Sequence, residues 1–263
     1  MKFQIDRSKF FKSLSHIQGV VDKKNSLPIL SNILIEAESN RLCLSSTDMD
    51  ISIIEEMDCN IFEDGSTTIN SQILYDIVRK LDENSEIEVI SNNGKLLTLR
   101  ASGSRFSLAC LPKEDFPIIE RENPGISVKI NSQIFFKLIN KTKFAISNEE
   151  TRYFLNGLYF SINKDKEKNI LTIVGTDGHR LAKFSHELDQ NVDELSGVII
   201  PKKTIYELSK LLSETHTDIE IVISPNKIIF YIDNVILLSK LIDGSFPDYK
   251  RVIPTDNQNI IKI

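Results

Sequence analysis

Residues 175–181, Gly-Thr-Asp-Gly-His-Arg-Leu, hold the side chains of this chain best suited to chemistry. An acid (Asp177), an imidazole (His179) and a guanidinium (Arg180) lie within four positions, which could pair a base with an orienting carboxylate. The two glycines, however, predict a turn of the Asp-Gly kind, and the sequence brings no serine or cysteine nucleophile near. The pattern therefore favours a binding rim, with Arg180 as donor and Leu181 as apolar floor.

Other catalytic and metal-binding patterns are not found in the sequence. It contains no phosphate-binding loop, dinucleotide fingerprint, zinc-protease motif, elbow serine or paired CxxC. Asp48 and Asp50 could be offered as a metal or acid pair, but a solvated turn is the better interpretation. The histidines lack ligand spacing and the cysteines read as buried thiols: His16, His179, His186 and His216; Cys43, Cys59 and Cys110. We expect no metal and no cofactor.

The composition is that of an ordinary soluble globular protein. Of 263 residues, 41% are apolar and 26% are charged, and the net charge is -5. The length suits two domains of roughly 100 to 150 residues each. No apolar run is long enough to span a membrane and no signal peptide is evident, so a cytoplasmic location without membrane attachment is expected.

Apolar periodicity predicts one structural unit repeated four times. Helices are expected at 7–21, 71–81, 132–145 and 202–213, each after a short strand and before about three more strands. Longer matches support the repeat: Thr47-Asp48 and Thr176-Asp177 lie 129 residues apart, and Phe116-Pro117 and Phe246-Pro247 lie 130 apart. Two units make a domain, so the predicted class is α+β, with two helices per domain packed on antiparallel sheet.

Polar residues that can cap helices precede three of the predicted helices, at Asp6, Asn70 and Asn131. The strands are expected at 2–5, 32–36, 41–45, 50–55, 66–69, 86–90, 96–101, 105–110, 127–130, 155–162, 170–174, 180–184, 198–200, 218–223, 228–232 and 235–242.

Positive charge is concentrated on the predicted helices. Together they carry 11 Lys or Arg and 2 acids, a net charge of +9, which leaves -14 for the rest of the chain. For a single helix, lysine on a solvated face would explain this, since lysine is a good helix former. Repeated on all four helices, it indicates a surface for a regular polyanion whose phosphates are neutralised without reading sequence.

Motifs spread over the whole chain resemble the bacterial DNA polymerase III beta subunit family, the sliding clamps. They are Met1-Lys2-Phe3, Leu27-Pro28-Ile29-Leu30, Ser46-Thr47-Asp48, Arg105-Phe106-Ser107-Leu108, Asp115-Phe116-Pro117, Arg152-Tyr153-Phe154-Leu155-Asn156-Gly157, Thr176-Asp177-Gly178-His179-Arg180-Leu181 and Phe246-Pro247-Asp248-Tyr249-Lys250-Arg251-Val252. The resemblance implies repeated clamp domains and a non-catalytic processivity factor. In the family, two three-domain subunits form a ring of six domains, and twelve helices line a hole for duplex DNA.

The resemblance and the charge pattern together give candidate site residues. Candidate DNA contacts are Lys9, Lys12, Lys23, Lys24, Arg79, Lys80, Lys137, Lys141, Arg152, Tyr153, Lys202 and Lys203. The implied pocket for partner peptides comprises Leu155, Thr176, Gly178, His179, Arg180, Leu181, Pro247, Arg251 and Val252. The implied subunit edge includes Arg105, Phe106 and Leu108. Lys24 and Phe154 replace an arginine and a tyrosine common in relatives, and Phe154 lacks the hydroxyl.

The resemblance also implies partners and domain boundaries. The partners are duplex DNA, bound without sequence preference, and the replicative polymerase, clamp loader and repair proteins, bound through short linear motifs. A homodimeric ring is expected when a third domain is present. We expect clamp domains at 1–121 and 122–254, and a linker with the first strand of a third domain at 255–263, and therefore a truncated form.

Two alternatives stay open at this stage. One is a small αβ enzyme that uses Asp177 and His179. The other is a closed trimer of two-domain chains, like the eukaryotic clamp, because three times two domains is also six.

Overall fold

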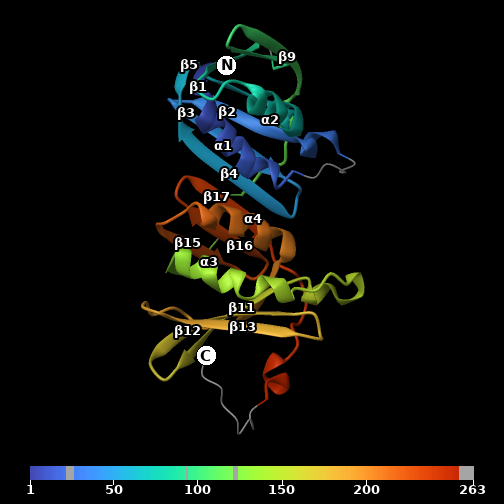
Figure 1. Ribbon diagram of the computed structural model, residues 1–263, viewed down its shortest axis with the longest axis vertical. Coiled ribbons are helices and arrows are strands. Elements are labelled where there is room, and N and C mark those ends of the chain that lie inside the picture. Colours follow the sequence, from blue (N-terminus) through green and yellow to red (C-terminus); the bar gives the residue numbers. More distant parts are fainter. Residues whose placement is uncertain (22–26, 93, 121–123, 255–263) are drawn as a thin grey trace.

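The computed structural model describes residues 1–21, 27–92, 94–120 and 124–254. Within them, the fold consists of four copies of one unit, in which a strand is followed by a helix and three more strands (Figure 1). The first unit comprises β1 (Lys2–Asp6), α1 (Arg7–Gln18), β2 (Asn32–Glu38), β3 (Arg41–Thr47) and β4 (Ile51–Asp58). The second comprises β6 (Gly65–Asn70), α2 (Ser71–Lys80), β7 (Glu86–Asn92), β8 (Leu96–Ala101) and β9 (Ser104–Leu111). The third comprises β10 (Ile126–Asn131), α3 (Ser132–Asn140), β11 (Gly157–Asp165), β12 (Lys168–Thr176) and β13 (Leu181–Leu188). The fourth comprises β14 (Leu195–Pro201), α4 (Lys202–Ser213), β15 (Asp218–Ile223), β16 (Lys227–Ile232) and β17 (Val235–Lys240).

The predicted order of elements is confirmed, with one strand missed. That strand, β5 (Asn60–Glu63), pairs antiparallel with β1. Short 3-10 helices occupy the connections, at Pro28–Ser31, Lys113–Asp115, Lys143–Ala145, Glu150–Leu155 and Tyr249–Val252.

The predicted helix starts are confirmed, and side chains cap three of them. Asp6 accepts a hydrogen bond from the Lys9 amide at 3.0 Å, and Asn70 accepts one from the Ile73 amide at 3.0 Å. Asn131 caps α3 in the same way. Such caps satisfy amides that have no partner within the helix, which is why these helices begin where they do.

Two predicted helix ends were placed too late. Helix α1 ends at Gln18 rather than residue 21: Gly19, a poor helix former, follows, and the Val20 amide donates to the Ile17 carbonyl at 3.2 Å in a tighter closing turn. Helix α3 ends at Asn140 rather than 145. There the Thr142 hydroxyl donates to the Leu138 carbonyl at 2.8 Å, a local bond that competes with continued helix.

The strands of the described residues form one long sheet and one short sheet, and the long sheet runs through both halves of the molecule. Its order is β10-β15-β16-β17-β4-β3-β2-β6-β9-β8-β7-β1-β5, and the short sheet has the order β13-β12-β11-β14. The first half (1–120) meets the second half (124–254) where β17 pairs antiparallel with β4, with Leu237 opposite Ile53. We call this strand pairing, together with the α1–α4 contact beside it, the seam.

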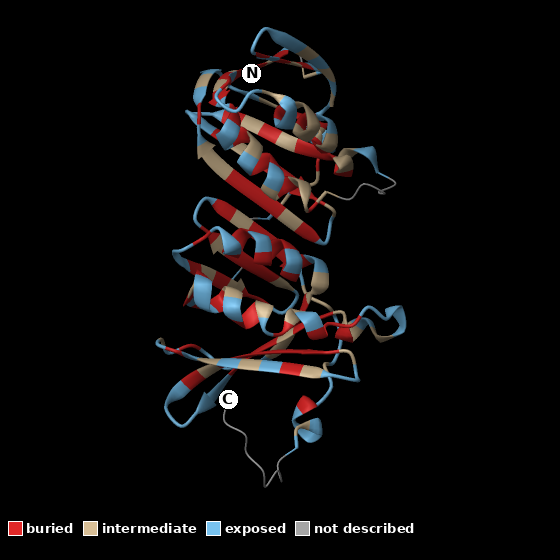
Figure 2. Cartoon of the chain, viewed as in Figure 1, coloured by how far each residue is buried: buried red, intermediate tan, exposed pale blue. Residues whose placement is uncertain are grey.

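All four helices lie on one face of the elongated molecule, in the spatial order α2, α1, α4, α3 (Figure 1). Helix α1 packs on α2 and α3 packs on α4. Buried phenylalanines fix the helices to the sheets: Phe10 on Phe3 at 6.4 Å between ring centroids, and Phe135 on Phe160 at 6.3 Å. Exposed residues remain on the outward helix surfaces (Figure 2).

The Asn70 cap supplies a test of this local account. Asn70→Ala removes the acceptor for the Ile73 amide and should lower the free energy of unfolding by about 1 kcal/mol in urea denaturation. Asn70→Asp keeps the acceptor and should retain the stability of the unaltered chain. Equal stability of all three proteins would contradict the cap.

Candidate functional site

The basic helix face predicted from sequence exists, with a smaller charge than expected. Within the observed bounds, α1–α4 carry nine Lys or Arg and two acids, a net charge of +7. Lys9, Lys80, Lys137 and Lys141 are exposed. Arg7, by contrast, is buried, and its Nε donates to the Val78 carbonyl at 2.9 Å, so it caps the end of α2. The face can hold an extended polyanion.

Several of the candidate DNA contacts are already engaged within the protein. Lys12 pairs with Glu214 at 3.1 Å and Arg79 with Asp76 at 3.1 Å. Lys203 bonds to Asp48 at 2.5 Å and to the Val20 carbonyl at 2.8 Å, so it joins the two halves. Lys202 reaches Asn148 and lies 5.7 Å from the ring centroid of Tyr206. Lys23 and Lys24 lie outside the described residues.

The turn at 176–180 is held by its own side chains. The Thr176 hydroxyl donates to the Arg180 carbonyl at 2.7 Å and accepts from the Gly178 amide at 3.1 Å. Oδ1 of Asp177 accepts from the His179 and Arg180 amides, both at 3.0 Å, and Oδ2 accepts from Nε of Arg180 at 3.0 Å. These backbone hydrogen bonds, and less strongly the Arg180 side chain, lower the pKa of Asp177 to about 2.

This bonding removes Asp177 from any catalytic role with His179. The carboxylate binds the backbone amide of His179 rather than its imidazole. A carboxylate that stays ionised to such low pH is a poor proton acceptor near neutrality. The turn is therefore a rigid display for the exposed His179 and Arg180 side chains.

Three chain segments approach one another around this turn, and we call the surface they share the candidate groove. Gly178 has φ +90°, and a Cβ there would stand 2.6 Å from a guanidinium nitrogen of Arg152, so the 3-10 helix Glu150–Leu155 touches the turn. A Cβ on Gly244 would lie 3.1 Å from Phe154, and Phe246 stacks on Tyr159 at 4.9 Å. Of the predicted pocket residues, Leu155 and those at 176–181 thus belong to neighbouring segments, and the segment that leads into Pro247 approaches them through Gly244 and Phe246.

The individual pocket residues differ in what they can offer. Leu155 is 2% exposed, so it belongs to the core beneath the groove. Leu181 is half-buried, and Thr176 is buried and shapes the turn. Gly178, Pro247, Arg251 and Val252 are exposed, and Val252 is 67% exposed.

Sequence reasoning missed two neighbours of this groove. Phe144 is 56% exposed and lies 5.7 Å from the Arg180 guanidinium, an apolar surface beside a cation. Glu149 forms a two-point ion pair with Arg152, at 2.8 and 2.7 Å. The spacing of three residues between Glu149 and Arg152 was a usable signal, but nothing in the sequence marks Phe144 as exposed.

The predicted subunit edge is an open strand edge within the described residues. β9 pairs with β8 along its length but with β6 only through Leu111 and Cys110. Arg105 is exposed, and Phe106 and Leu108 are half-buried. Unpaired backbone groups next to partly covered apolar side chains can accept another strand.

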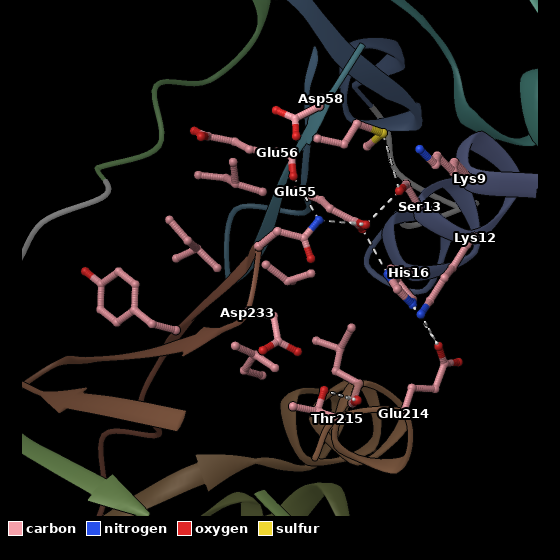
Figure 3. Close-up of a pocket in the computed structure, with 18 of the residues that line it drawn as sticks. Lys9, Lys12, Ser13, His16, Glu55, Glu56, Asp58, Glu214, Thr215 and Asp233 are labelled. Atoms are coloured by element: carbon pink, nitrogen blue, oxygen red, sulfur yellow. Dashed lines mark hydrogen bonds and ion pairs between the residues drawn. The ribbon is translucent and has the colours of Figure 1, made fainter. Parts of the chain in front are cut away.

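A cavity of about 750 Å³ lies at the seam, and sequence reasoning did not predict it. Figure 3 shows Lys9, Lys12 and His16 of α1 on one side, Glu55 and Glu56 of β4 across from them, and Glu214 below. Its mixed charges point to contacts between the two halves more than to a ligand.

Within the described ranges, no group of three or more His, Cys, Asp or Glu residues is placed to hold a metal ion. Likewise, no helix of the described chain is long and apolar enough to cross a membrane. Cys43, Cys59 and Cys110 are thiols that form no disulfide, and burial raises the pKa of the Cys59 thiol to about 11.

Comparison with known proteins agrees with this arrangement. Residues 1–120 match the DNA polymerase III beta subunit N-terminal domain, and residues 129–248 match the central domain of the same subunit. The beta sliding clamp of Caulobacter vibrioides is 41% identical over 264 residues, covering 100% of this chain and 71% of the relative. That of Rickettsia bellii is 38% identical over 267 residues, covering 100% of this chain and 69% of the relative.

Solved structures show the same fold. The sliding clamp of Bartonella birtlesii bound to griselimycin has a TM-score of 0.93 at 43% identity, covering 98% of this chain and 69% of that one. The Caulobacter crescentus pol III beta structure has a TM-score of 0.91 at 42% identity, covering 98% and 70%.

Repeated clamp domains with a basic helix face define the class of DNA clamps. Within that class, the chain belongs to the bacterial DNA polymerase III beta subunit family, the beta sliding clamps, and spans about 70% of the length of these relatives. It is accordingly a non-catalytic processivity subunit of DNA replication, and the enzyme alternative is wrong.

The low pKa of Asp177 supplies a test of how the turn is held. The folded chain favours the ionised carboxylate of Asp177. Its contribution to the stability of the turn is therefore present above pH 3.8 and is lost only as the pH falls toward about 2. NMR shifts of the His179 and Arg180 amides should therefore titrate with a midpoint near 2.

Arg180→Gln is the matched control for the Asp177 titration. It removes the ion pair but keeps both backbone hydrogen bonds, which are the larger cause of the shift, so the midpoint should move only part of the way toward 3.8. A complete return to 3.8 would show that the ion pair, not the backbone, holds the turn.

Proposed function

We propose that the chain forms part of a ring around duplex DNA, with domains at 1–121 and 122–254 and with α1–α4 facing the DNA. The observation that carries this proposal is the presence of all four helices on one face, with +7 net charge, in a chain of net charge -5. Such a lining attracts phosphates without fixing a sequence, which suits a protein that must slide. The expected cytoplasmic location is part of this proposal.

Among the candidate DNA contacts, the exposed Lys9, Lys80, Lys137 and Lys141 are the primary ones. Lys12, Arg79, Arg152 and Lys202 are secondary, because each must exchange a partner within the protein for a phosphate. Exposed ion pairs are weak enough for such exchange. Tyr153, 54% exposed, lies beside Arg152, whereas Lys203 serves the seam.

The groove at 176–181 is proposed as the docking site for the replicative polymerase, the clamp loader and repair proteins through short linear motifs. Its apolar members are Leu181, Phe144 and Val252, and its exposed donors are His179, Arg180 and Arg251. A peptide with apolar side chains and a carboxylate or free carbonyl groups would match both sets. The Bartonella relative was solved with griselimycin bound, which makes this compound a practical probe.

Ring closure is proposed to use the open edge of β9, with Arg105, Phe106 and Leu108 at the contact, in a homodimer when a third domain is present. The trimer alternative would instead pair β9 of one copy with β13 of the next. In the seam, Ile236 of β17 lies opposite Ile54 of β4.

Because the units repeat, β13 is the counterpart of β4 and β9 is the counterpart of β17. The register seen in the seam therefore predicts which residues would face each other in a β9–β13 pair. The strand pairs Thr47–Ser52 and Thr176–Leu181 correspond, as do Ile232–Val235 and Ala101–Ser104. Ile54 therefore corresponds to Lys183, and Ile236 corresponds to Arg105. In the trimer, these two basic side chains would lie directly opposite each other. Like charges directly opposite each other destabilise a strand pair, so the trimer is not part of the proposal.

The DNA proposal is tested by salt dependence. Affinity for a labelled duplex, measured by fluorescence anisotropy, should be weak, independent of sequence and steeply reduced by salt. In Lys9→Gln/Lys137→Gln, the slope of log affinity against log salt should fall by about 0.9 for each phosphate that is no longer neutralised.

The control for this DNA measurement is Lys164→Gln/Lys183→Gln, which removes the same charge from exposed strand positions away from the helix face. It should leave the slope nearly unchanged. Equal reductions of the slope in both double variants would mean that net charge alone, rather than the helix face, governs binding.

The groove proposal is tested with griselimycin and isothermal titration calorimetry. Leu181→Glu should abolish binding with little loss of stability, since Leu181 is only half-buried. Leu155 is unsuitable, because a charge at this buried position would unfold the core. Ile118→Glu, at a site 94% exposed in the first half, is the control and should bind as the unaltered chain does. Binding that survives Leu181→Glu would place the ligand elsewhere.

A further inference from the structure

The seam contains a buried carboxylate that no lysine or arginine neutralises among the described residues. Glu55 of β4 is 3% exposed, and its Oε1 accepts from the Ser13 hydroxyl at 2.6 Å. Its Oε2 lies 2.9 Å from Nδ1 of His16 on α1. The corresponding position of β13 holds Phe184, so the fold itself does not require an acid here. A buried carboxylate needs a charged partner, and His16 is the group placed to provide one.

The second ring nitrogen of His16 faces the other half of the molecule. Nε2 lies 3.5 Å from Glu214, which directly follows α4, and Lys12 pairs with the same carboxylate at 3.1 Å (Figure 3). His16 thus stands between one carboxylate of the first half and one of the second. Its side chain is only 12% exposed, so solvent screens these charges poorly.

Backbone pairing across the seam ends beside the same cluster. The Glu56 amide donates to the Asn234 carbonyl at 3.0 Å, and the Asn234 side chain donates to the Glu56 carbonyl at 2.8 Å. Asn234 Nδ2 also approaches Oε1 of Glu55 at 3.5 Å. A change in the charge around Glu55 therefore acts on the hydrogen bonds that join the two halves.

The remaining charged groups around the cavity have partners of their own or face solvent. Arg41 pairs with Glu56 at 3.6 Å, and Asp233 accepts from the Thr217 hydroxyl at 2.6 Å. Lys9 and Asp58 are exposed. These contacts leave His16 as the group whose protonation alters the charge balance between Glu55 and Glu214.

We propose that His16 is a pH-sensitive tie across the seam. Protonated, it bridges Glu55 of the first half and Glu214 of the second and holds β4, β17, α1 and α4 in register. When His16 is neutral, its ring no longer attracts Glu55 on one side and Glu214 on the other. The seam then opens more readily. This inference does not rest on DNA or peptide binding.

The direction of the pH effect follows from the environment of His16. Burial lowers the pKa of His16, but hydrogen bonding and attraction from Glu55, and then from Glu214, outweigh burial and raise it above 6.5. A raised histidine pKa stabilises the fold fully below pH 6.5, and this stabilisation is lost as the pH rises through the folded-state value. The seam is therefore firmer at pH 6 than at pH 8.

Hydrogen exchange of the full chain tests the tie. After correction for intrinsic rates, the amides of β4 and β17 should be about 3- to 10-fold better protected at pH 6 than at pH 8. His16→Gln, which is neutral at both pH values, should abolish this difference. Glu214→Gln should reduce it, because it removes one of the two carboxylates that favour the charged ring.

Glu187→Gln is the matched control, since Glu187 is an exposed carboxylate paired with Lys168 at 2.6 Å on another sheet. It should keep the full pH difference. Equal protection at pH 6 and pH 8 in the unaltered chain, or a pH effect that survives His16→Gln, would overturn the proposal. If His16→Gln does not fold, NMR titration of the unaltered chain decides: a His16 ring midpoint at or below 6.5 would overturn it as well.

Discussion

The antiparallel pairing of β17 with β4 is the contact on which the arrangement of the molecule depends. It merges strands from both halves into one sheet, and because each helix packs on its own part of the strands, it also brings α1 and α4 together. The basic residues of four separate helices thereby become one surface (Figure 1). Without this pairing, each half would present only two helices.

Polar groups at the seam provide a specificity that an apolar contact could not. Lys203 and Lys240 of the second half reach Asp48 and Asp50 of the first, and His16 lies between Glu55 and Glu214. Charged contacts specify one relative position of the two halves, whereas apolar side chains tolerate sliding. The apolar pairs, such as Leu237 with Ile53, supply burial beneath them.

Periodicity and capping residues predicted the repeat and the helix starts, because both are local properties, and motifs spread over the chain predicted the clamp family by resemblance. It placed the end of α3 too late, since a threonine bond to the preceding turn is as local but has no strong sequence signature. It missed the seam cluster entirely: Glu55 sits in a strand whose burial depends on a neighbour about 180 residues away, Val235. The exposure of Phe144 and the burial of Leu155 are likewise set by tertiary packing.

The turn beside Asp48 has nearly the same geometry as the turn beside Asp177, with Met49 at φ 80° where the second turn has Gly178 at φ 90°. In the first half, that turn is closed by Lys203 and Lys240 arriving from the adjoining half. The second turn stands at the corresponding end of its own half. The outer edge of β13 corresponds to the edge of β4 that pairs with β17, so a strand added there would lie beside the turn at 176–180 as β17 lies beside the turn at 47–51.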